Sequence, residues 1–276
     1  MKTRLLLLCA LMGVLVACDK NANEPQQVAF RKGQQVTLRV NASLNQDVQA
    51  PRRVSGTIAS DGALDFAWEE GDEIQVIVGG TPATFTMTSF TGASAEFTGA
   101  MPADGESFDV TYTPANAPTA EQIKQQTAAS LEEVQTIDKK YFSLEAKNCQ
   151  LGNNISLRWI YSAIKVSMQA DGFPIDIKLI RIMSSDAATT ASVLCFDHLQ
   201  EVGVEETYVY IVINDFTALT GATWGCGVYN DDKVLSGDES PFYICGEKNF
   251  KNLNQFEAGN IYVLPTMTVQ IVYDPD

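Results

Sequence analysis

The sequence predicts an all-β protein built from two tandem β-sandwich domains. Segments with alternating apolar and polar residues recur about every 10 to 15 residues, and Gly or Pro separates them. This spacing is typical of sandwiches and barrels rather than of parallel sheets with intervening helices. The 276 residues suit one large domain or two ordinary ones, and a hydrophobic content of 45% is enough to fill their cores.

The first domain is expected over residues 36–148. Its predicted strands are 36–42, 74–78, 83–88, 95–98 and 108–113. One short helix is expected near 119–134, because Thr119 and Gln122 have the spacing of a capping box. Apolar or small residues then follow at helical spacing, which predicts one buried face for this helix.

The second domain is expected over residues 149–276, with the boundary in a polar stretch around 146–155. Its predicted strands are 157–168, 175–182, 207–213, 224–228, 241–245 and 261–272. The segment 157–168 is so apolar that a buried helix remains an alternative there.

The N-terminus predicts export as a lipoprotein. Residues 1–17 combine basic Lys2 and Arg4 with a short apolar run, which is the pattern of a signal peptide. The run ends in Leu-Val-Ala before Cys18, which resembles a bacterial lipobox and predicts lipid attachment at Cys18. The alternative is an ordinary signal peptide followed by a chance cysteine. Residues 18–35 are polar and are expected to form a flexible tether.

Composition excludes several classes of function. The formal net charge of −15 disfavours sequence-independent nucleic-acid binding, which requires a basic surface. A single histidine, His198, excludes zinc sites built on several histidines. No nucleophile-elbow, phosphate-loop or dinucleotide motif is present. We therefore expect a protein that is not an enzyme and that needs no cofactor or metal, although a pair of glycosidase carboxylates has no sequence signature.

Four cysteines lie in the second half of the chain and could form disulfides outside the cytoplasm: Cys149, Cys195, Cys226 and Cys245. They could equally serve as small buried hydrophobic residues, since each has apolar neighbours.

Other polar and aromatic clusters have plain structural interpretations. The acidic run 69–73 could bind calcium but lacks a spaced ligand pattern, so a charged turn is favoured. The Asp197–His198 pair is expected in a solvated loop. Trp68 and Trp159 are expected in the core. A surface platform for glycans could instead combine Trp224 with Tyr229 or Tyr243.

Several segments resemble the fimbrillin-family lipoproteins of Bacteroidota. Residues 67–76, AWEEGDEIQV, resemble the family's W-x-x-G-D-x-I-x-V segment. The stretches ATFT at 83–86, AEFTG at 95–99, VTYTP at 110–114 and FEAGNIYVL at 256–264 follow in the family's order. The similarity covers most of the chain after Cys18 and is clearest over 54–114 and 253–273.

The resemblance implies two transthyretin-like β-sandwiches and a subunit of type V pili or a related surface adhesin. It implies anchorage to the outer membrane through lipid, display at the cell surface and binding of host or bacterial surface ligands. It also implies other pilus subunits as partners: a protease removes the first strand, and a strand from another subunit takes its place. The alternative is a surface lipoprotein that binds glycans.

Arg52 and Arg53 are the expected positions of this proteolytic maturation. They follow the predicted first strand and precede the Trp68 segment, so a cut after either residue would release the strand. Arg31 is a poorer candidate, because cleavage there leaves the strand in place. The alternative is that 44–53 is a plain surface loop. The resemblance leaves open whether the chain's own last strands are donated or whether the chain forms a tip or an anchor.

Overall fold

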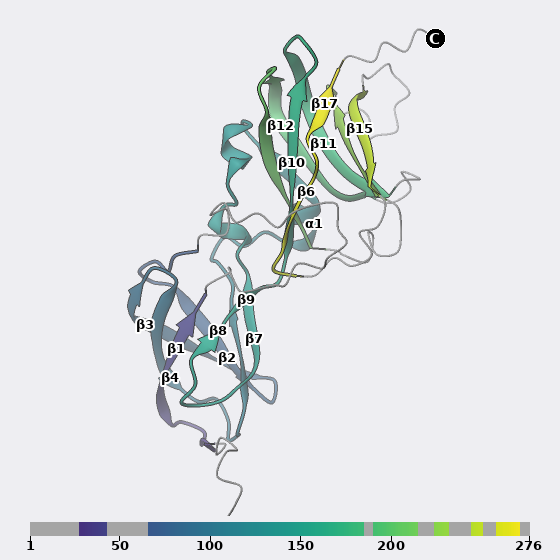
Figure 1. The fold of residues 1–276 in the computed structure, drawn as a ribbon. Coiled ribbons are helices and arrows are strands. Elements are labelled where there is room, and N and C mark those ends of the chain that lie inside the picture. The colour runs from purple at the N-terminus through teal and green to yellow at the C-terminus, as the bar shows by residue number, and fades with distance from the viewer. Residues whose placement is uncertain are drawn as a thin grey trace, which may run out of the picture.

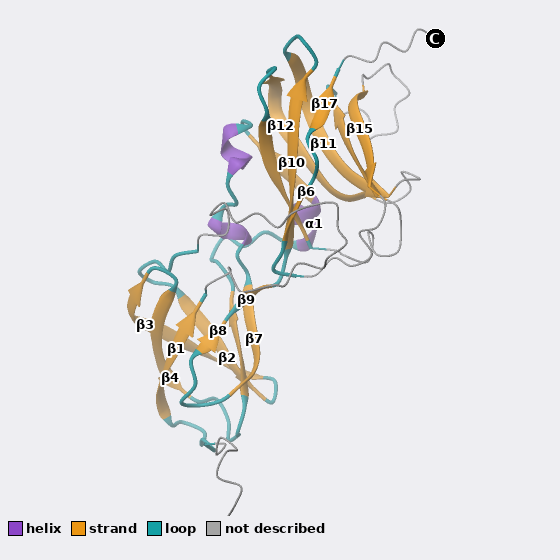
Figure 2. Cartoon of the chain, viewed as in Figure 1, coloured by secondary structure: helices purple, strands orange, loops and turns teal. Residues whose placement is uncertain are grey.

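A computed structural model describes residues 28–42, 66–184, 190–214, 224–231, 244–250 and 258–270 (Figures 1 and 2). The described chain consists mainly of β-strands, which confirms the all-β prediction. The strands form two units in Figure 1. The N-terminal unit is the lower, purple-to-teal one, and the C-terminal unit is the upper, green-to-yellow one.

The N-terminal unit is one eight-stranded sheet that curls around its own core. Its strand order is β8-β1-β4-β3-β2-β5-β7-β9. Their bounds are β1 (Gln35–Asn41), β2 (Glu73–Val78), β3 (Thr81–Thr91), β4 (Ser94–Ala100), β5 (Phe108–Tyr112), β7 (Leu144–Cys149), β8 (Ile155–Ser156) and β9 (Arg158–Trp159). The two outermost strands, β8 and β9, are separated only by Leu157. One short segment thus joins both margins of the sheet and closes it.

Period-two alternation explains this unit. In β2 the side chains of Ile74, Val76 and Val78 are buried, and the residues between them are more exposed. Gly79 and Gly80 form the two-residue turn to β3, and both have positive φ, of 56° and 84°. A tight hairpin turn favours this conformation, which glycine adopts without steric cost.

The C-terminal unit is a sandwich of two sheets. One has the order β13-β10-β16, with β17 also paired to β10, and the other has the order β15-β14-β11-β12-β6. Their bounds are β6 (Gln125–Ala128), β10 (Ser162–Ala170), β11 (Ile175–Ser184), β12 (Thr190–Val202), β13 (Thr207–Ile213), β14 (Trp224–Tyr229), β15 (Ile244–Phe250), β16 (Ile261–Val263) and β17 (Met267–Val269). Buried residues of both sheets form one apolar cluster between them.

The segment predicted at 157–168 is extended, so its helical alternative is wrong. It is divided into β9 and β10 by residues 160–161. The start of β10 lies between two cores: Ile164 and Val166 belong to the sandwich core, whereas Ala163 belongs to the core of the N-terminal unit. Together with the buried Leu157 and Trp159 of the preceding segment, these residues account for the apolar character of 157–168.

The one short helix expected near 119–134 is present, but it occupies only the beginning of that range. Helix α1 (Ala120–Lys124) begins with the expected capping box between Thr119 and Gln122, but the chain then forms β6, parallel to β12. Two short 3₁₀ segments follow, η1 (Glu132–Gln135) and η2 (Lys139–Tyr141). The helix ends early because residues 125–128 find backbone partners on β12.

The chain passes between the two units more than once. Strand β6 lies before residue 148 and pairs in the C-terminal unit, whereas β8 and β9 lie after it and pair in the N-terminal unit. The division into domains at 36–148 and 149–276 stays a prediction. A strand before residue 148 contributes to the C-terminal unit, and strands after it contribute to the N-terminal unit.

Gln126 links the margins of the two sheets of the sandwich. Its side-chain amide accepts a hydrogen bond from the Val212 N–H at 3.1 Å and donates to the Val212 carbonyl at 2.8 Å. It also donates to Ser192 Oγ and to the Ile123 carbonyl. The amide thus satisfies the outer edge of β13 as a neighbouring strand would.

Replacing Gln126 with Met should lower the free energy of unfolding by about 2–3 kcal/mol, because the buried Val212 N–H loses its acceptor. The side chain of the neighbouring Gln125 is exposed and bonds only Glu121 within the described chain, so Gln125→Met is a matched control with an expected cost below about 0.5 kcal/mol. Urea denaturation of both variants measures the difference. Equal losses would contradict the role given to Gln126.

Candidate functional site

The first strand of the chain is inserted between two others. Strand β1 pairs antiparallel with β4 along its whole length, from Gln35 opposite Ala100 to Asn41 opposite Ser94. On its other side only Val40 and Asn41 pair with β8, in parallel. The earlier part of β1 has no strand partner on this side among the described residues. Backbone pairing therefore holds β1 mainly through β4.

The inner face of β1 is apolar and fills the core. Leu38, Val40 and the following Ala42 are 3%, 2% and 0% exposed, whereas Thr37 and Arg39 point outward. The same core contains Phe97 of the adjacent strand β4 and Phe85 of β3, the next strand in the sheet. Removal of β1 would leave an apolar slot lined by Phe85 and Phe97, and it would leave the edge of β4 unpaired.

The chain leaves and re-enters this unit at one point. The Ala42 N–H donates to the Ala93 carbonyl at 2.8 Å, and the Trp68 indole Nε1–H donates to the same carbonyl at 2.8 Å. The backbone N–H of Trp68 also bonds the Gly92 carbonyl. Ala42, before residues 43–65, and Trp68, just after them, therefore both bond the turn between β3 and β4.

The segment after this re-entry point is fixed by an ion-pair network. Lys139 Nζ lies 2.9 Å from Asp72 Oδ2 and 3.1 Å from Glu69 Oε2, and it sits over the Phe66 ring. The Tyr112 hydroxyl donates to Asp72 Oδ1 at 3.0 Å. Burial and the nearby Asp72 carboxylate raise the pKa of Tyr112, so the phenol stays protonated and keeps donating.

This network supports the interpretation of the acidic run 69–73 as a charged turn. The Glu69 N–H bonds Asp72 Oδ2, which is typical of such a turn. Within the described ranges, no group of three or more acidic, Cys or His side chains is placed to hold a metal ion.

The N-terminal side of β1 is also attached to the fold. The Phe30 side chain is 2% exposed, and Phe30 and Gly105 exchange two backbone hydrogen bonds, of 2.8 and 3.1 Å. The Gly33 N–H bonds the Met101 carbonyl. Phe30 and Gly33 therefore dock on the fold, although both lie within the tether that was expected to extend to residue 35. A lone Phe in a polar stretch gives little sequence signal of this docking.

The structure leaves the modification sites predicted from the sequence untested. Cys18, Arg52 and Arg53 lie outside the described residues. Arg31 is exposed, and its backbone N–H bonds the Gln34 side chain.

The cysteines occupy different environments. Cys149 and Cys226 are free thiols, and burial raises the pKa of Cys149 to about 11. Cys226 lies in the sandwich core, whereas Cys195 packs on the opposite face of the same sheet. They flank β11, opposite Ile182 and Leu179. The Cys245 side chain is outside the described residues, and a disulfide that involves it stays a prediction.

The aromatic and histidine expectations have mixed outcomes. Trp68 and Trp159 are each 1% exposed, which agrees with core positions for both. His198 is exposed as expected but lies in strand β12 rather than in a loop. Tyr229 is buried and bonds the Met183 sulfur, so it cannot contribute to a surface platform. The side chains of Trp224 and Tyr243 fall outside the described residues.

Sequence reasoning missed Lys139, Tyr112 and the Ala93 carbonyl. Each acts through a partner far along the chain, and only the register of the strands brings these partners together. Among the described residues, no helix is both long and apolar enough to cross a membrane.

Comparisons with known proteins give distant structural neighbours only. No family model and no curated sequence matches the chain. Solved structures similar to it include a protein of proposed cell-adhesion function from Bacteroides uniformis, with 14% identity, coverage of 85% of this chain and 92% of that one, and a TM-score of 0.37.

A second neighbour is the tip fimbrial protein Mfa3 from Porphyromonas gingivalis, with 11% identity, coverage of 71% and 78%, and a TM-score of 0.30. A third, of proposed cell-adhesion function from Parabacteroides distasonis, has 10% identity, coverage of 90% and 96%, and a TM-score of 0.29. Similarity at TM-scores below 0.5 gives no evidence about the function of this chain.

Proposed function

We propose that this chain is a non-enzymatic, cell-surface subunit of a pilus or adhesin that is exported as a lipoprotein and assembles by exchange of its first strand. The observation that carries the proposal is the setting of β1. The strand fills an apolar slot and pairs mainly with β4. It is joined to the rest of the unit through residues 43–65, and Ala42 and Trp68, on either side of that segment, both bond the Ala93 carbonyl.

A cut after Arg52 or Arg53 would leave β1 held without a covalent link to the remainder of the unit. The segment after the cut keeps its own attachments, namely the two bonds of Trp68 and the ion pairs of Lys139. The slot would then accept a strand that belongs to another subunit and has apolar residues at alternate positions. This strand would restore both the backbone pairing and the core.

Such an exchange joins different surfaces of two copies, so repetition produces a filament rather than a closed ring. In this proposal the lipid on Cys18 holds the uncut precursor on the outer membrane, because two or three acyl chains anchor far more firmly than one. The partners are other subunits of the same surface structure.

The proposal is tested on the chain that begins at Asp19, treated with an arginine-specific protease. N-terminal sequencing should find new starts at Arg53 or Val54, and the cleaved protein should form a ladder of oligomers on size-exclusion chromatography. An excess of a synthetic peptide of residues 35–43 should suppress the ladder by refilling the slot. Cleaved protein that keeps its strand and stays monomeric would rule out exchange.

Two controls separate cleavage from assembly. The double variant Arg52→Gln/Arg53→Gln should remain uncut between residues 43 and 65 and should stay monomeric. A peptide with Asp in place of Val40 has the wrong chemistry for the slot and should not suppress the ladder, because Val40 is 2% exposed.

A further inference from the structure

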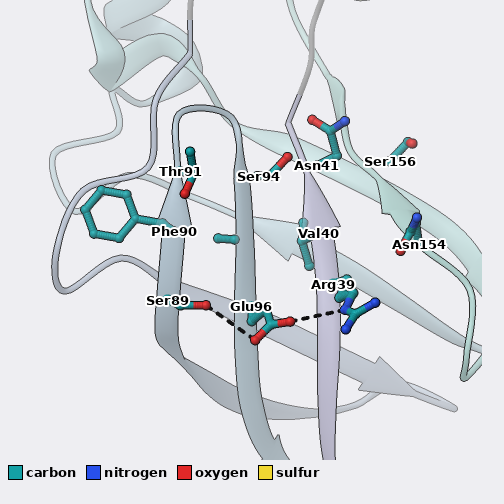
Figure 3. A pocket seen from close by; sticks show the side chains of 11 residues that line it. Arg39, Val40, Asn41, Ser89, Phe90, Thr91, Ser94, Glu96, Asn154 and Ser156 are labelled. Carbon is teal, nitrogen blue, oxygen red and sulfur yellow. Dashed lines mark hydrogen bonds and ion pairs between the residues drawn. The ribbon is translucent and has the colours of Figure 1, made fainter.

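An open groove lies on the outer face of the N-terminal unit, across β3, β4, β1 and the residues around β8 (Figure 3). Its volume is about 540 Å³, within the range of roughly 300–1,000 Å³ that small-molecule sites occupy. Figure 3 shows the polar side chains gathered along adjacent strands, and the Phe90 ring pointing away from them.

The strand register arranges these side chains in two rows. In the first row, Ser89 lies opposite Glu96, and Glu96 lies opposite Arg39. In the second row, Thr91 lies opposite Ser94, Ser94 opposite Asn41, and Asn41 opposite Ser156. Asn154 lines the groove beside them. Hydroxyl and amide groups thus form a continuous strip over four strands.

The charges of the groove cancel. Arg39 Nε donates to Glu96 Oε1 at 3.1 Å, and Ser89 Oγ donates to Glu96 Oε2 at 3.4 Å, so both carboxylate oxygens are occupied. Arg39 and Glu96 are the only charged residues among the described ones that line the groove. An anionic ligand would meet one neutralised Arg on a chain with a net charge of −15, and an apolar ligand would find few contacts.

The second row retains unused hydrogen-bonding capacity. The Thr91 and Ser94 hydroxyls are exposed and bond no other described group, as is also true of the side chains of Asn154 and Ser156. The Arg39 guanidinium, on a side chain that is 74% exposed, uses only Nε within the described chain. These groups can both donate to and accept from a ligand that carries many hydroxyls.

We propose that this groove is a binding site for a neutral oligosaccharide, recognised through hydroxyl and amide groups of four adjacent strands. We expect an uncharged ligand because the charges of Arg39 and Glu96 cancel in the groove. We expect a ligand rich in hydroxyls because the lining hydroxyl and amide groups can both donate and accept hydrogen bonds. The site differs from the aromatic platform around Trp224 that the sequence suggests.

Saturation-transfer NMR on the uncut chain from Asp19 tests the site with maltohexaose, cellohexaose, xylohexaose and laminarihexaose, and with a heparin hexasaccharide as a charged probe. At least one neutral sugar should bind. The double variant Thr91→Ala/Ser94→Ala should weaken that binding roughly tenfold, because two contacts to the ligand are lost.

The matched control is Thr37→Ala/Thr98→Ala. It removes two hydroxyls from the same sheet face, where they bond each other at 3.0 Å outside the groove, and it should leave sugar binding unchanged. The proposal is overturned if no neutral sugar gives transfer at about 10 mM. Preference for the heparin fragment, or equal losses in both double variants, would also overturn it. Because the uncut chain is used, failure here leaves strand exchange unaffected.

Discussion

Placing a carboxylate on the inner face of β1, by Val40→Asp, is expected to lower the free energy of unfolding of the N-terminal unit by about 4 kcal/mol. Val40 is 2% exposed and lies between Ala95 of β4 and Ile155 of β8, both of which are buried. No Lys or Arg side chain is buried in the described part of the chain, so none there could pair with the new carboxylate inside the core. Urea denaturation followed by the fluorescence of Trp68 and Trp159, both in this core, measures the loss.

Thr37→Asp is the matched control, because Thr37 lies on the same strand but on its exposed face. Its expected cost is below about 1 kcal/mol, mainly from the lost bond to Thr98. If the outward variant were as damaging as the inward one, the register given for β1 would be incorrect. The contrast also fixes which face an incoming strand must present to the slot.

Trp68→Ala is expected to cost about 3–5 kcal/mol, as for other large aromatic residues in cores. The indole makes edge contacts with Phe66, Phe97 and Tyr112 at ring-centroid separations of 4.9, 4.9 and 5.0 Å. Its Nε1–H bonds the Ala93 carbonyl, so the substitution both opens a cavity and loosens the point of re-entry. The midpoint of thermal unfolding, followed by circular dichroism, is the measurement.

Trp68→Phe separates these two effects. The ring remains to fill most of the volume, but the donor to Ala93 is lost, so we expect a smaller cost of about 1–2 kcal/mol. A result in which Trp68→Ala costs less than about 1 kcal/mol would show that the core adapts around this position, and that Trp68 does not hold the segment after residue 65.

Local patterns in the sequence predicted most strands correctly. Alternation marks β2 and β5, and the glycine pair after Val78 marks a turn, because these signals depend on neighbouring residues alone. Helix α1 shows the limit of such reasoning. Its capping box was readable, but its end was not, because the competing partner of residues 125–128 is β12, more than 60 residues away.

The candidate sites were less predictable, for the same reason. The apolar alternation of β1 indicated a strand, but its insertion beside β4 depends on pairing with residues 94–100. Likewise, no pattern in the sequence marks Thr91, Ser94 or Asn41 as part of a binding site. They form one strip only once the strands are in register.

The direction of β1 has a mechanical consequence. In Figure 1 the described chain begins at the lower end of the N-terminal unit, and β1 runs upward from there beside β4. Tension between an N-terminal anchor and the far end of the molecule would pull β1 lengthwise, so its seven register pairs with β4 would resist together. The resistance of a protein to pulling is governed by its unfolding rate, which such simultaneous breaking of hydrogen bonds would slow. In an intact chain anchored at its N-terminus, the strand that one proteolytic cut could free would therefore be the element that carries the load.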